Sequence, residues 1–250
     1  MRRIAVLVGW SLLAITATAV AGPVKTQDIT FLSGSETIAG YLATPATPGK
    51  YPALVVIHDD WGLTDWVKEQ TRKLAGQGYV ALAVDLYRGQ TAYDPALAYD
   101  LMIGTPRDRA LRDLEAAIHL LYARPDVVKE KMGAIGWSAG GKWSLQLAVT
   151  DPFLAACVSN YGSVPTDPAD IQKINAPVLG IFGADDRSVL ATDAYAFEDA
   201  MKNAHKSIDL KIYRHAGHDF ENSGNRLGFN EDATADAWRR TVAFLDQHLK

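Results

Sequence analysis

The chain has 250 residues, of which 48% are hydrophobic and 22% are charged, and its formal net charge is −4. These values are typical of a globular protein with a sizeable core, and they exclude intrinsic disorder. The mildly acidic balance argues against a general nucleic-acid-binding protein. The one cysteine, Cys157, cannot form an internal disulfide, and the sequence has no H-E-x-x-H or C-x-x-C metal motif.

The first 21 residues have the pattern of a secretory signal peptide. Arg2 and Arg3 give a positive start, residues 4–20 are almost wholly apolar, and Ala19-Val20-Ala21 is an A-x-A cleavage signal. An uncleaved membrane anchor is the alternative, but the apolar run is near the lower length limit for a membrane span. We expect cleavage after Ala21, a periplasmic or secreted location, and no membrane association after cleavage.

Residues 22–250 are expected to form one domain that starts with an antiparallel hairpin. Two strands, at 28–32 and 37–42, are joined by Ser33-Gly34-Ser35. From residue 51 onward strands alternate with helices, and most of the strands are continuous apolar runs, as expected for strands buried on both faces. The expected strands are 53–57, 79–84, 132–135, 154–158, 178–182 and 208–213, and the last alternates in polarity as an edge strand does.

The expected helices each carry one apolar face. They begin near Thr64, at Thr105-Pro106, at Gly140 and after Asn230. This alternation predicts an α/β fold with a mostly parallel sheet and helices on both faces. The segment 88–105 has no clear period, and it is either a lid or binding loop or a short helix packed on the surface.

Residues 136–140 read Gly-Trp-Ser-Ala-Gly, a G-x-S-x-G motif between an expected strand and an expected helix. In this context the motif forms a nucleophile elbow, a strained turn in which side chains at the glycine positions would collide with the neighbouring strand and helix. The turn exposes the hydroxyl of Ser138 and directs the backbone N–H of Ala139 at the reacting carbonyl. The alternative is a strand-to-helix turn that needs glycine only for packing.

Two later motifs supply partners for Ser138 in the chain order nucleophile, acid, histidine. Asp186 and His218 each follow an expected strand, at the edge where open α/β sheets bind ligands. The sequence thus predicts Ser138 as nucleophile, His218 as general base and Asp186 as the acid that orients the imidazole. His215 and Asp185 are the neighbouring alternatives; Gly217 beside His218 suits an exposed turn and favours His218.

A second N–H donor for an oxyanion is expected in the loop after the strand at 53–57, which reads His58-Asp59-Asp60-Trp61-Gly62. We take the backbone N–H of Asp60 as the candidate. A polar turn hinged at Gly62 is the alternative. Two adjacent carboxylates and a histidine directly above the sheet favour a functional loop.

With these motifs the sequence resembles the dienelactone hydrolase family of α/β-hydrolases, over roughly residues 28–249. The stretches that carry the resemblance are VVIHDDWG (55–62), AVDLYRG (83–89), GWSAGGKWSLQ (136–146), FGADDRSV (182–189) and YRHAGHDF (213–220). The resemblance implies the α/β-hydrolase fold and hydrolysis of a small ester or lactone. The family's G-x-x-D-x-x-V and A-G-H-x-F patterns favour Asp186 and His218 over their neighbours.

The sequence departs from the dienelactone-cleaving members of the family at the nucleophile. Those members have a cysteine where Ser138 stands, and a glutamate of the first loop interacts with the resting cysteine. The matching position here is Asp59, one methylene shorter, which then serves the substrate or the loop.

A second departure concerns the substrate carboxylate, which the resemblance assigns to two arginines. Arg88 lies near the first arginine position, whereas Asn222 stands at the second and Arg226 is a candidate substitute. We give Arg88 two alternative roles, a grip on an anionic substrate or a structural ion pair on the surface. With Asp59 and Arg88, the candidate substrate-binding residues are Trp61 and Trp137.

The leading hypothesis is an exported serine hydrolase that cleaves a small carboxylic ester or lactone through an acyl-enzyme on Ser138, without a metal or organic cofactor. Thioesterase or peptidase activity on the same fold stays open, because fold does not fix function. A non-catalytic protein that binds a small molecule is a third hypothesis, and the complete serine, aspartate and histidine set argues against it. The oligomeric state is not specified by the sequence.

Overall fold

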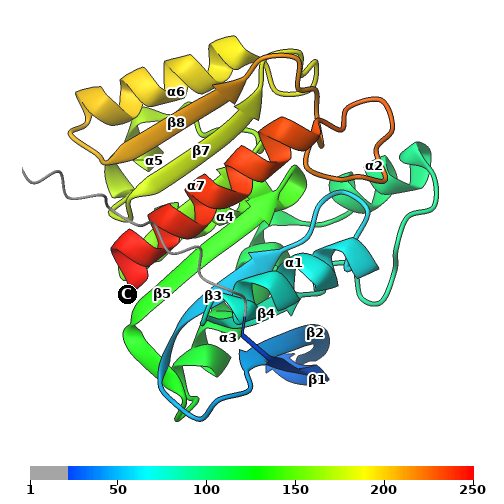
Figure 1. Cartoon of the computed structure of the whole chain (residues 1–250), viewed down its shortest axis with the longest axis vertical. Coiled ribbons are helices and arrows are strands. Elements are labelled where there is room, and N and C mark those ends of the chain that lie inside the picture. Colours follow the sequence, from blue (N-terminus) through cyan, green and yellow to red (C-terminus); the bar gives the residue numbers. More distant parts are fainter. Residues whose placement is uncertain (1–21) are drawn as a thin grey trace, which may run out of the picture.

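An eight-stranded sheet forms the centre of the protein, with the strand order β1-β2-β4-β3-β5-β6-β7-β8 (Figure 1). The structure, a computed structural model, describes residues 22–250, so the expected signal peptide lies outside the described residues. The strands are β1 (Val24–Ser33), β2 (Glu36–Pro45), β3 (Tyr51–Ile57), β4 (Val80–Val84), β5 (Val127–Trp137), β6 (Ala156–Asn160), β7 (Val178–Gly183) and β8 (Ile208–Tyr213).

The sheet is mixed in the way the sequence predicts. β1 pairs antiparallel with β2 as a hairpin, and β2 pairs antiparallel with β4. All other neighbouring pairs are parallel. β8 forms one edge, as its alternating polarity indicated, and β1 forms the other. The carboxyl ends of the parallel strands therefore meet along one edge of the sheet, which is where the candidate site residues lie.

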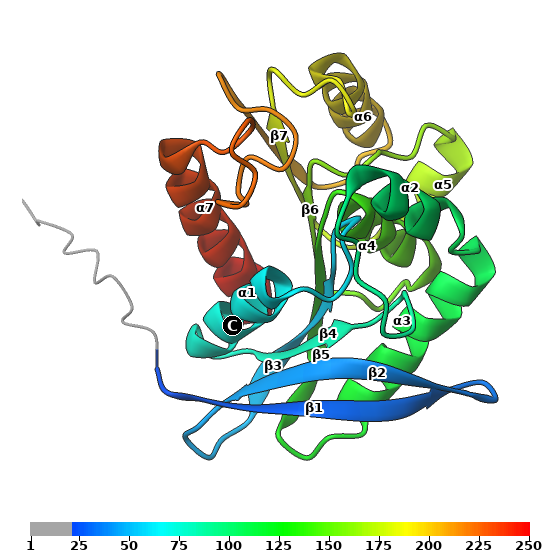
Figure 2. The same cartoon turned by 90° about the vertical axis from the view of Figure 1, so that its right-hand side faces the viewer.

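Helices cover both faces of the sheet (Figure 2). One face is covered by α1 (Asp65–Gly76) and α7 (Glu231–Leu249), and the other by α3 (Arg107–Tyr122), α4 (Ala139–Thr150), α5 (Pro168–Lys173) and α6 (Ala191–Asn203). The strands supply side chains to two apolar cores. In β3, for example, Val55 and Ile57 pack into one cluster, whereas Leu54 and Val56 pack into the other. This alternation explains why the central strands are apolar throughout.

The segment 88–105 contains a short helix, α2 (Pro95–Ile103). Asp94 caps its N-terminus by accepting a hydrogen bond from the N–H of Leu97, over 2.9 Å. Ala98 is the buried residue of this helix, so α2 lies on the surface. Of the two alternatives for this segment, the structure shows the surface helix.

Several element boundaries differ from the sequence-based expectation. β5 is longer than the expected 132–135, and α5 and α6 were not expected. Asn230 caps α7 as expected by accepting a hydrogen bond from Ala233 N–H over 3.0 Å, whereas the Thr64 side chain makes no capping bond to α1. The amphipathic stripes of the long helices were visible in the sequence, but short helices offer too few turns for a clear period.

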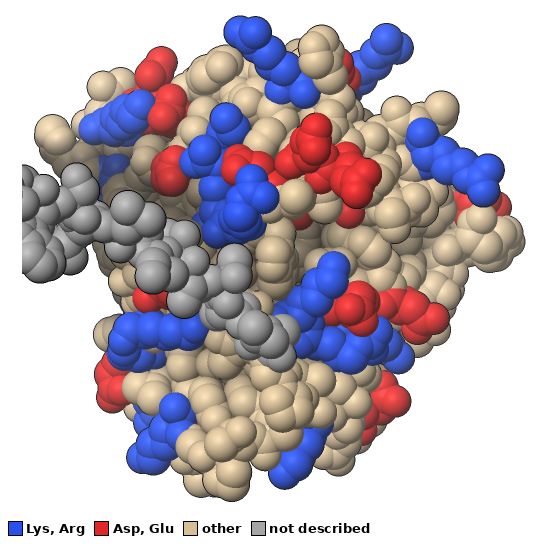
Figure 3. All heavy atoms as spheres, in the orientation of Figure 1, with Lys and Arg blue, Asp and Glu red and all other residues tan. Residues whose placement is uncertain are grey.

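Acidic and basic side chains are interspersed on the face of the molecule shown in Figure 3. Within residues 22–250, no helix combines the length and the apolar character needed to cross a membrane.

Candidate active site

Ser138 sits on a sharp turn between β5 and α4. Its backbone has φ 52° and ψ −117°, a left-handed conformation that is strained for a residue with a side chain. A Cβ atom on Gly136 would lie 2.1 Å from the carbonyl oxygen of Gly140, and one on Gly140 would lie 2.2 Å from the carbonyl oxygen of Ile57. The two glycines of the motif are therefore required by close backbone contacts, as a nucleophile elbow demands.

The hydroxyl of Ser138 is the first member of a hydrogen-bonded chain through His218 to Asp186. Ser138 Oγ lies 2.7 Å from His218 Nε2, and His218 Nδ1 lies 2.7 Å from Asp186 Oδ2. The other oxygen of Asp186 accepts hydrogen bonds from the backbone N–H groups of Ser188 and Val189. These bonds fix the carboxylate, which in turn holds Nδ1 protonated and leaves Nε2 free to face the serine.

The neighbouring histidine and aspartate lie outside this chain. His215 Nδ1 is 3.9 Å from Asp185 Oδ2, and both side chains are largely exposed. The structure thus brings together Ser138, His218 and Asp186, the set that the sequence favoured.

The surroundings of His218 favour its charged form. Burial disfavours the imidazolium, but the hydrogen bond that Nδ1 donates to Asp186 and the negative charges of Asp219, Asp186 and Asp60 outweigh it, so the pKa of His218 is raised above its ordinary value. Burial raises the pKa of Asp219 to about 6. Burial, together with the charge of Asp219, holds the pKa of Asp59 well above its usual range. The site is therefore rich in carboxyl groups that are costly to ionise.

The two candidate oxyanion donors belong to residues next to Ser138, one in the chain and one through its side chain. Ala139 is the first residue of α4, and the first N–H groups of a helix have no acceptor within the helix. Residue 60 lies in the loop after β3, and its side chain reaches the serine hydroxyl. The backbone N–H of Ala139 and that of Asp60 are thus available for the role that we propose for them below.

The side chain of Asp60 makes a contact that the sequence analysis missed. Its Oδ2 atom lies 2.8 Å from Ser138 Oγ. The family resemblance places the acid near the nucleophile at Asp59, but the Asp59 carboxylate is buried and accepts the backbone N–H of Trp61 over 2.9 Å. The doubled aspartate was the available signal. Which of the two side chains turns toward the serine depends on the backbone of the loop, which the sequence does not show.

His58 joins the loops that follow two adjacent strands. Its Nδ1 atom lies 2.6 Å from the carbonyl oxygen of Asp59, and its Nε2 atom accepts a hydrogen bond from the N–H of Leu86 over 3.2 Å. Burial lowers the pKa of His58, so the neutral tautomer with a proton on Nδ1 fits both contacts. His58 therefore supports the loop that carries Asp59 and Asp60.

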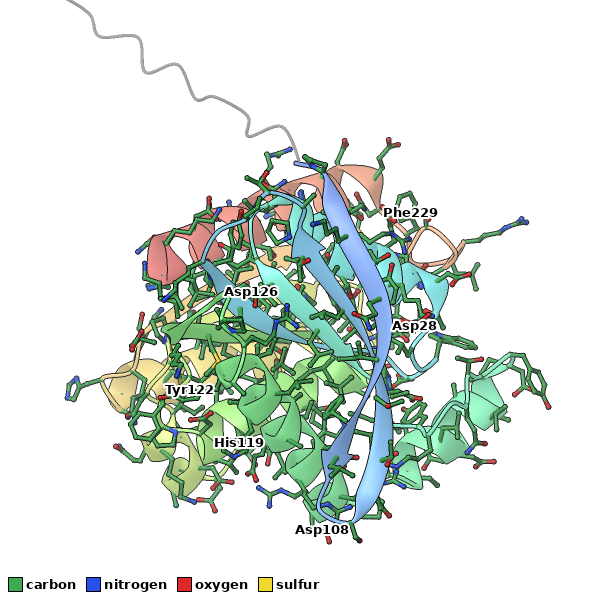
Figure 4. All side chains as sticks on the ribbon, turned by 90° about the horizontal axis from the view of Figure 1, so that it is seen from below. Asp28, Asp108, His119, Tyr122, Asp126 and Phe229 are labelled. Carbon is green, nitrogen blue, oxygen red and sulfur yellow. The ribbon has the colours of Figure 1, made fainter. Side chains whose placement is uncertain are left out.

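Of the two alternative roles for Arg88, a grip on an anionic substrate or a structural ion pair, the structure shows the ion pair. Its guanidinium forms ion pairs with Glu36 and with the buried carboxylate of Asp113, at 2.8 and 2.7 Å. These partners belong to the hairpin and to α3, and Figure 4 shows the hairpin tip beside the start of α3, near Asp108. Two carboxylates thus hold the Arg88 side chain between the hairpin and α3.

The expectation that Trp137 contacts the substrate is not met. Its side chain is 2% exposed and packs edge-on against Trp66, with ring centroids 5.2 Å apart. The residue before the nucleophile lies at the end of β5, where its side chain points into the core. Trp61 is partly exposed and lies close to Asp219, so it remains at the site.

The two candidate residues for the second arginine position lie in the loop between β8 and α7. Asn222 closes a turn by accepting the N–H of Gly224 over 2.9 Å, and Arg226 is exposed. Within residues 22–250, no group of three or more histidine, cysteine, aspartate or glutamate side chains is arranged to hold a metal ion.

A mostly parallel sheet with an elbow after β5 and an acid and a histidine after β7 and β8 defines an α/β-hydrolase. Residues 38–249 match the dienelactone hydrolase family, and the chain belongs to that family. This membership supports a hydrolase activity.

Relatives and a solved structure agree with this assignment. A Synechocystis protein provisionally named carboxymethylenebutenolidase is 31% identical over 91% of this chain and 98% of its own length. A Bradyrhizobium protein provisionally named 2-oxo-3-(5-oxofuran-2-ylidene)propanoate lactonase is 30% identical over 87% of this chain and 92% of its own. The crystal structure of a dienelactone hydrolase-like promiscuous phosphotriesterase from metagenomic libraries superposes with a TM-score of 0.84, at 27% identity, over 92% of this chain and 100% of that one.

Proposed function

We propose that the protein is a serine hydrolase of small carboxylic esters or lactones, with Ser138 as nucleophile. The observation that carries this proposal is the hydrogen-bonded chain from Ser138 through His218 to Asp186, with two contacts of 2.7 Å. In this arrangement His218 can act as the base for the Ser138 hydroxyl, and Asp186 can orient His218. A serine hydroxyl needs both partners to become an active nucleophile. The provisional names of the two relatives, a carboxymethylenebutenolidase and a lactonase, support an ester or lactone as substrate.

In the acylation step, the oxygen of Ser138 attacks the carbonyl carbon while Nε2 of His218 takes the hydroxyl proton. The carbonyl oxygen becomes an oxyanion, which the backbone N–H groups of Ala139 and Asp60 stabilise. When the tetrahedral intermediate collapses, the bond to the leaving oxygen breaks, and His218 returns its proton to that oxygen. The products are an acyl-enzyme and an alcohol; from a lactone, the alcohol stays attached to the acyl group.

In the deacylation step, His218 takes a proton from water, whose oxygen attacks the acyl carbon. Collapse of the second tetrahedral intermediate breaks the bond to Ser138 Oγ, which recovers its proton from His218 and releases a carboxylic acid. Asp186 stabilises the imidazolium in both steps without taking its proton. The buried position of Asp186 and its two backbone hydrogen bonds suit this constant role.

A covalent probe and a substrate panel test this proposal. A fluorophosphonate should label wild-type protein at Ser138, and a panel of esters, lactones, thioesters and peptides should show hydrolysis. Ser138→Ala should abolish labelling and lower turnover by about 10⁴-fold or more. Ser159→Ala is the matched control, because Ser159 is a buried serine that is not hydrogen-bonded to His218 or Asp186. This variant should keep both the labelling and the turnover. Equal turnover by wild type and Ser138→Ala would refute the assignment.

We also propose that the protein is exported and cleaved after Ala21. The support is the charged, apolar and A-x-A pattern of the first 21 residues. The intact mass of protein recovered from the periplasm of a Gram-negative expression host should correspond to a chain that begins at Gly22. A full-length mass in the cytoplasmic fraction alone would contradict export.

A further inference from the structure

The carboxylate of Asp60 and the imidazole of His218 meet at the same serine oxygen. Asp60 Oδ2 lies 2.8 Å and His218 Nε2 lies 2.7 Å from Ser138 Oγ. The other carboxylate oxygen, Oδ1 of Asp60, is shielded from solvent and has no hydrogen-bond partner among residues 22–250. The carboxylate is thus directed at the reacting atom, and no structural partner compensates its charge.

Two acceptors compete here for one hydroxyl proton. If an ionised Asp60 accepts the proton, Nε2 of His218 faces a lone pair of Oγ, and the contact is favourable only when Nε2 carries a proton of its own. If Nε2 accepts the hydroxyl proton, Asp60 faces a lone pair and must itself be protonated. In both cases Asp60, Ser138 and His218 together carry one proton too many for general-base catalysis. That reaction needs the proton on Ser138, a free Nε2 on His218 and no proton on Asp60.

The surroundings of Asp60 add further carboxyl groups, whose raised pKa values reflect how poorly negative charge is compensated here. Asp219 and Asp186 act on His218 together with Asp60, and Asp59 lies close to both Asp60 and Asp219. Among residues 22–250, no lysine or arginine forms an ion pair with Asp59, Asp60 or Asp219.

We propose that Asp60 makes the site selective for esters with a positive charge close to the scissile carbonyl, in either the acyl or the alcohol part. This inference rests on the proposed function and names the substrate class of the same site. A quaternary ammonium or protonated amine beside Asp60 takes the place of the extra proton, which is released to solvent. Ser138 then donates its hydrogen bond to a neutral His218, and the nucleophile is ready.

Esters that carry a carboxylate are disfavoured by the same arrangement. A second negative charge beside Asp60 has no cation to neutralise it, because Arg88 is held by Glu36 and Asp113. Selectivity therefore has an attractive part, for cations, and a repulsive part, against anions.

Two matched series of substrates test the proposal. In the first, the acetate esters of choline, of its neutral carbon isostere dimethylbutanol and of a sulfonated alcohol differ mainly in charge. In the second, nitrophenyl esters carry a trimethylammonium, a tert-butyl or a carboxylate group at the end of the same acyl chain. We expect kcat/KM for the cationic ester to exceed that for its neutral isostere by about 10-fold or more in at least one series, with the anionic ester slowest.

The variant Asp60→Asn keeps the shape of the side chain and removes its charge. It should reduce the ratio between cationic and neutral esters to within about threefold, whatever happens to the absolute rates. Asp185→Asn removes an exposed carboxylate that lies beside His215, and it should keep the wild-type ratio. A cationic-to-neutral ratio near one in both wild-type series, or an unchanged ratio in Asp60→Asn, would overturn the proposal.

A measurement on the wild-type protein alone covers the case in which Asp60→Asn does not fold. Choline should inhibit hydrolysis of a neutral ester more strongly than dimethylbutanol does, and equal inhibition counts against the proposal. Different results would contradict the charge selectivity and the serine hydrolase activity. If Ser138 catalyses hydrolysis without any charge preference, the proposed role of Asp60 is refuted and the proposed serine hydrolase activity stands. If neither hydrolysis nor fluorophosphonate labelling is observed, the proposed serine hydrolase activity is itself refuted.

Discussion

Asp186 and His218 follow adjacent parallel strands, β7 and β8, and the carboxylate of Asp186 accepts a 2.7 Å hydrogen bond from Nδ1 of His218. The neighbours Asp185 and His215 belong to the same two loops, yet they meet at 3.9 Å in solvent. A displacement of one residue in the first loop and of three in the second therefore separates a buried, oriented pair from an exposed one. This difference allows the two positions to be tested against each other.

Asp186→Asn should lower kcat/KM by about 10²–10⁴-fold, because the amide no longer holds the imidazole in the tautomer that accepts the serine proton. Asp185→Asn should change kcat/KM by less than about threefold, since exposed pairs contribute little. Steady-state kinetics on one neutral ester, with thermal unfolding as a check on folding, compares the two variants. The reverse ranking would show that Asp185 is the acid.

The activity should depend on pH through His218. A general base acts in its neutral form, and the pKa of His218 is raised, so kcat/KM should fall as the pH drops through a value above about 6.5. Asp219 is among the charges that raise this pKa. Asp219→Asn should therefore move the acid limb of the pH profile to lower pH. A limb that stays in place or moves to higher pH would contradict this electrostatic origin.

Arg88→Ala should lower stability rather than alter substrate charge preference. Removing the guanidinium leaves the buried carboxylate of Asp113 without its ion-pair partner, and we expect a loss of about 1–3 kcal/mol in the free energy of unfolding, since Arg88 itself is partly exposed. Urea unfolding measures this loss, and Arg187→Ala, at an exposed position, is the control. A selective loss of activity on anionic esters, with stability unchanged, would restore the substrate-binding role.

Gly140→Ala should destabilise the elbow. The added Cβ would lie 2.2 Å from the carbonyl oxygen of Ile57 and 2.4 Å from that of His58, so the backbone of β3 or α4 has to move. We expect a loss of about 1–3 kcal/mol in unfolding free energy together with reduced turnover. Gly22→Ala in the chain that begins at residue 22 is a matched control, because its Cβ would meet its nearest atom at an ordinary 3.8 Å. Wild-type stability and turnover in Gly140→Ala would show that the contact is not required.

The sequence by itself determined the alternation of strands and helices, the antiparallel hairpin and the position of the elbow. These features follow from local patterns. Apolar runs predict buried strands, a spacing of three and four predicts helices, and glycines around Ser138 predict a tight turn. The candidate serine, histidine and aspartate could also be named, because parallel strands place the residues after their carboxyl ends at one edge of the sheet.

Only the tertiary structure decided which side chains near those strand ends reach the serine. Asp59 and Asp60 are identical in type and adjacent in the chain, but the turn after β3 buries one against Trp61 N–H and directs the other at Ser138 Oγ. The direction of a loop side chain is set by backbone dihedral angles and long-range contacts, which leave no periodic pattern in the sequence. Arg88 shows the same limit, since the carboxylates that hold it come from Glu36 and Asp113, distant in sequence and adjacent only after folding.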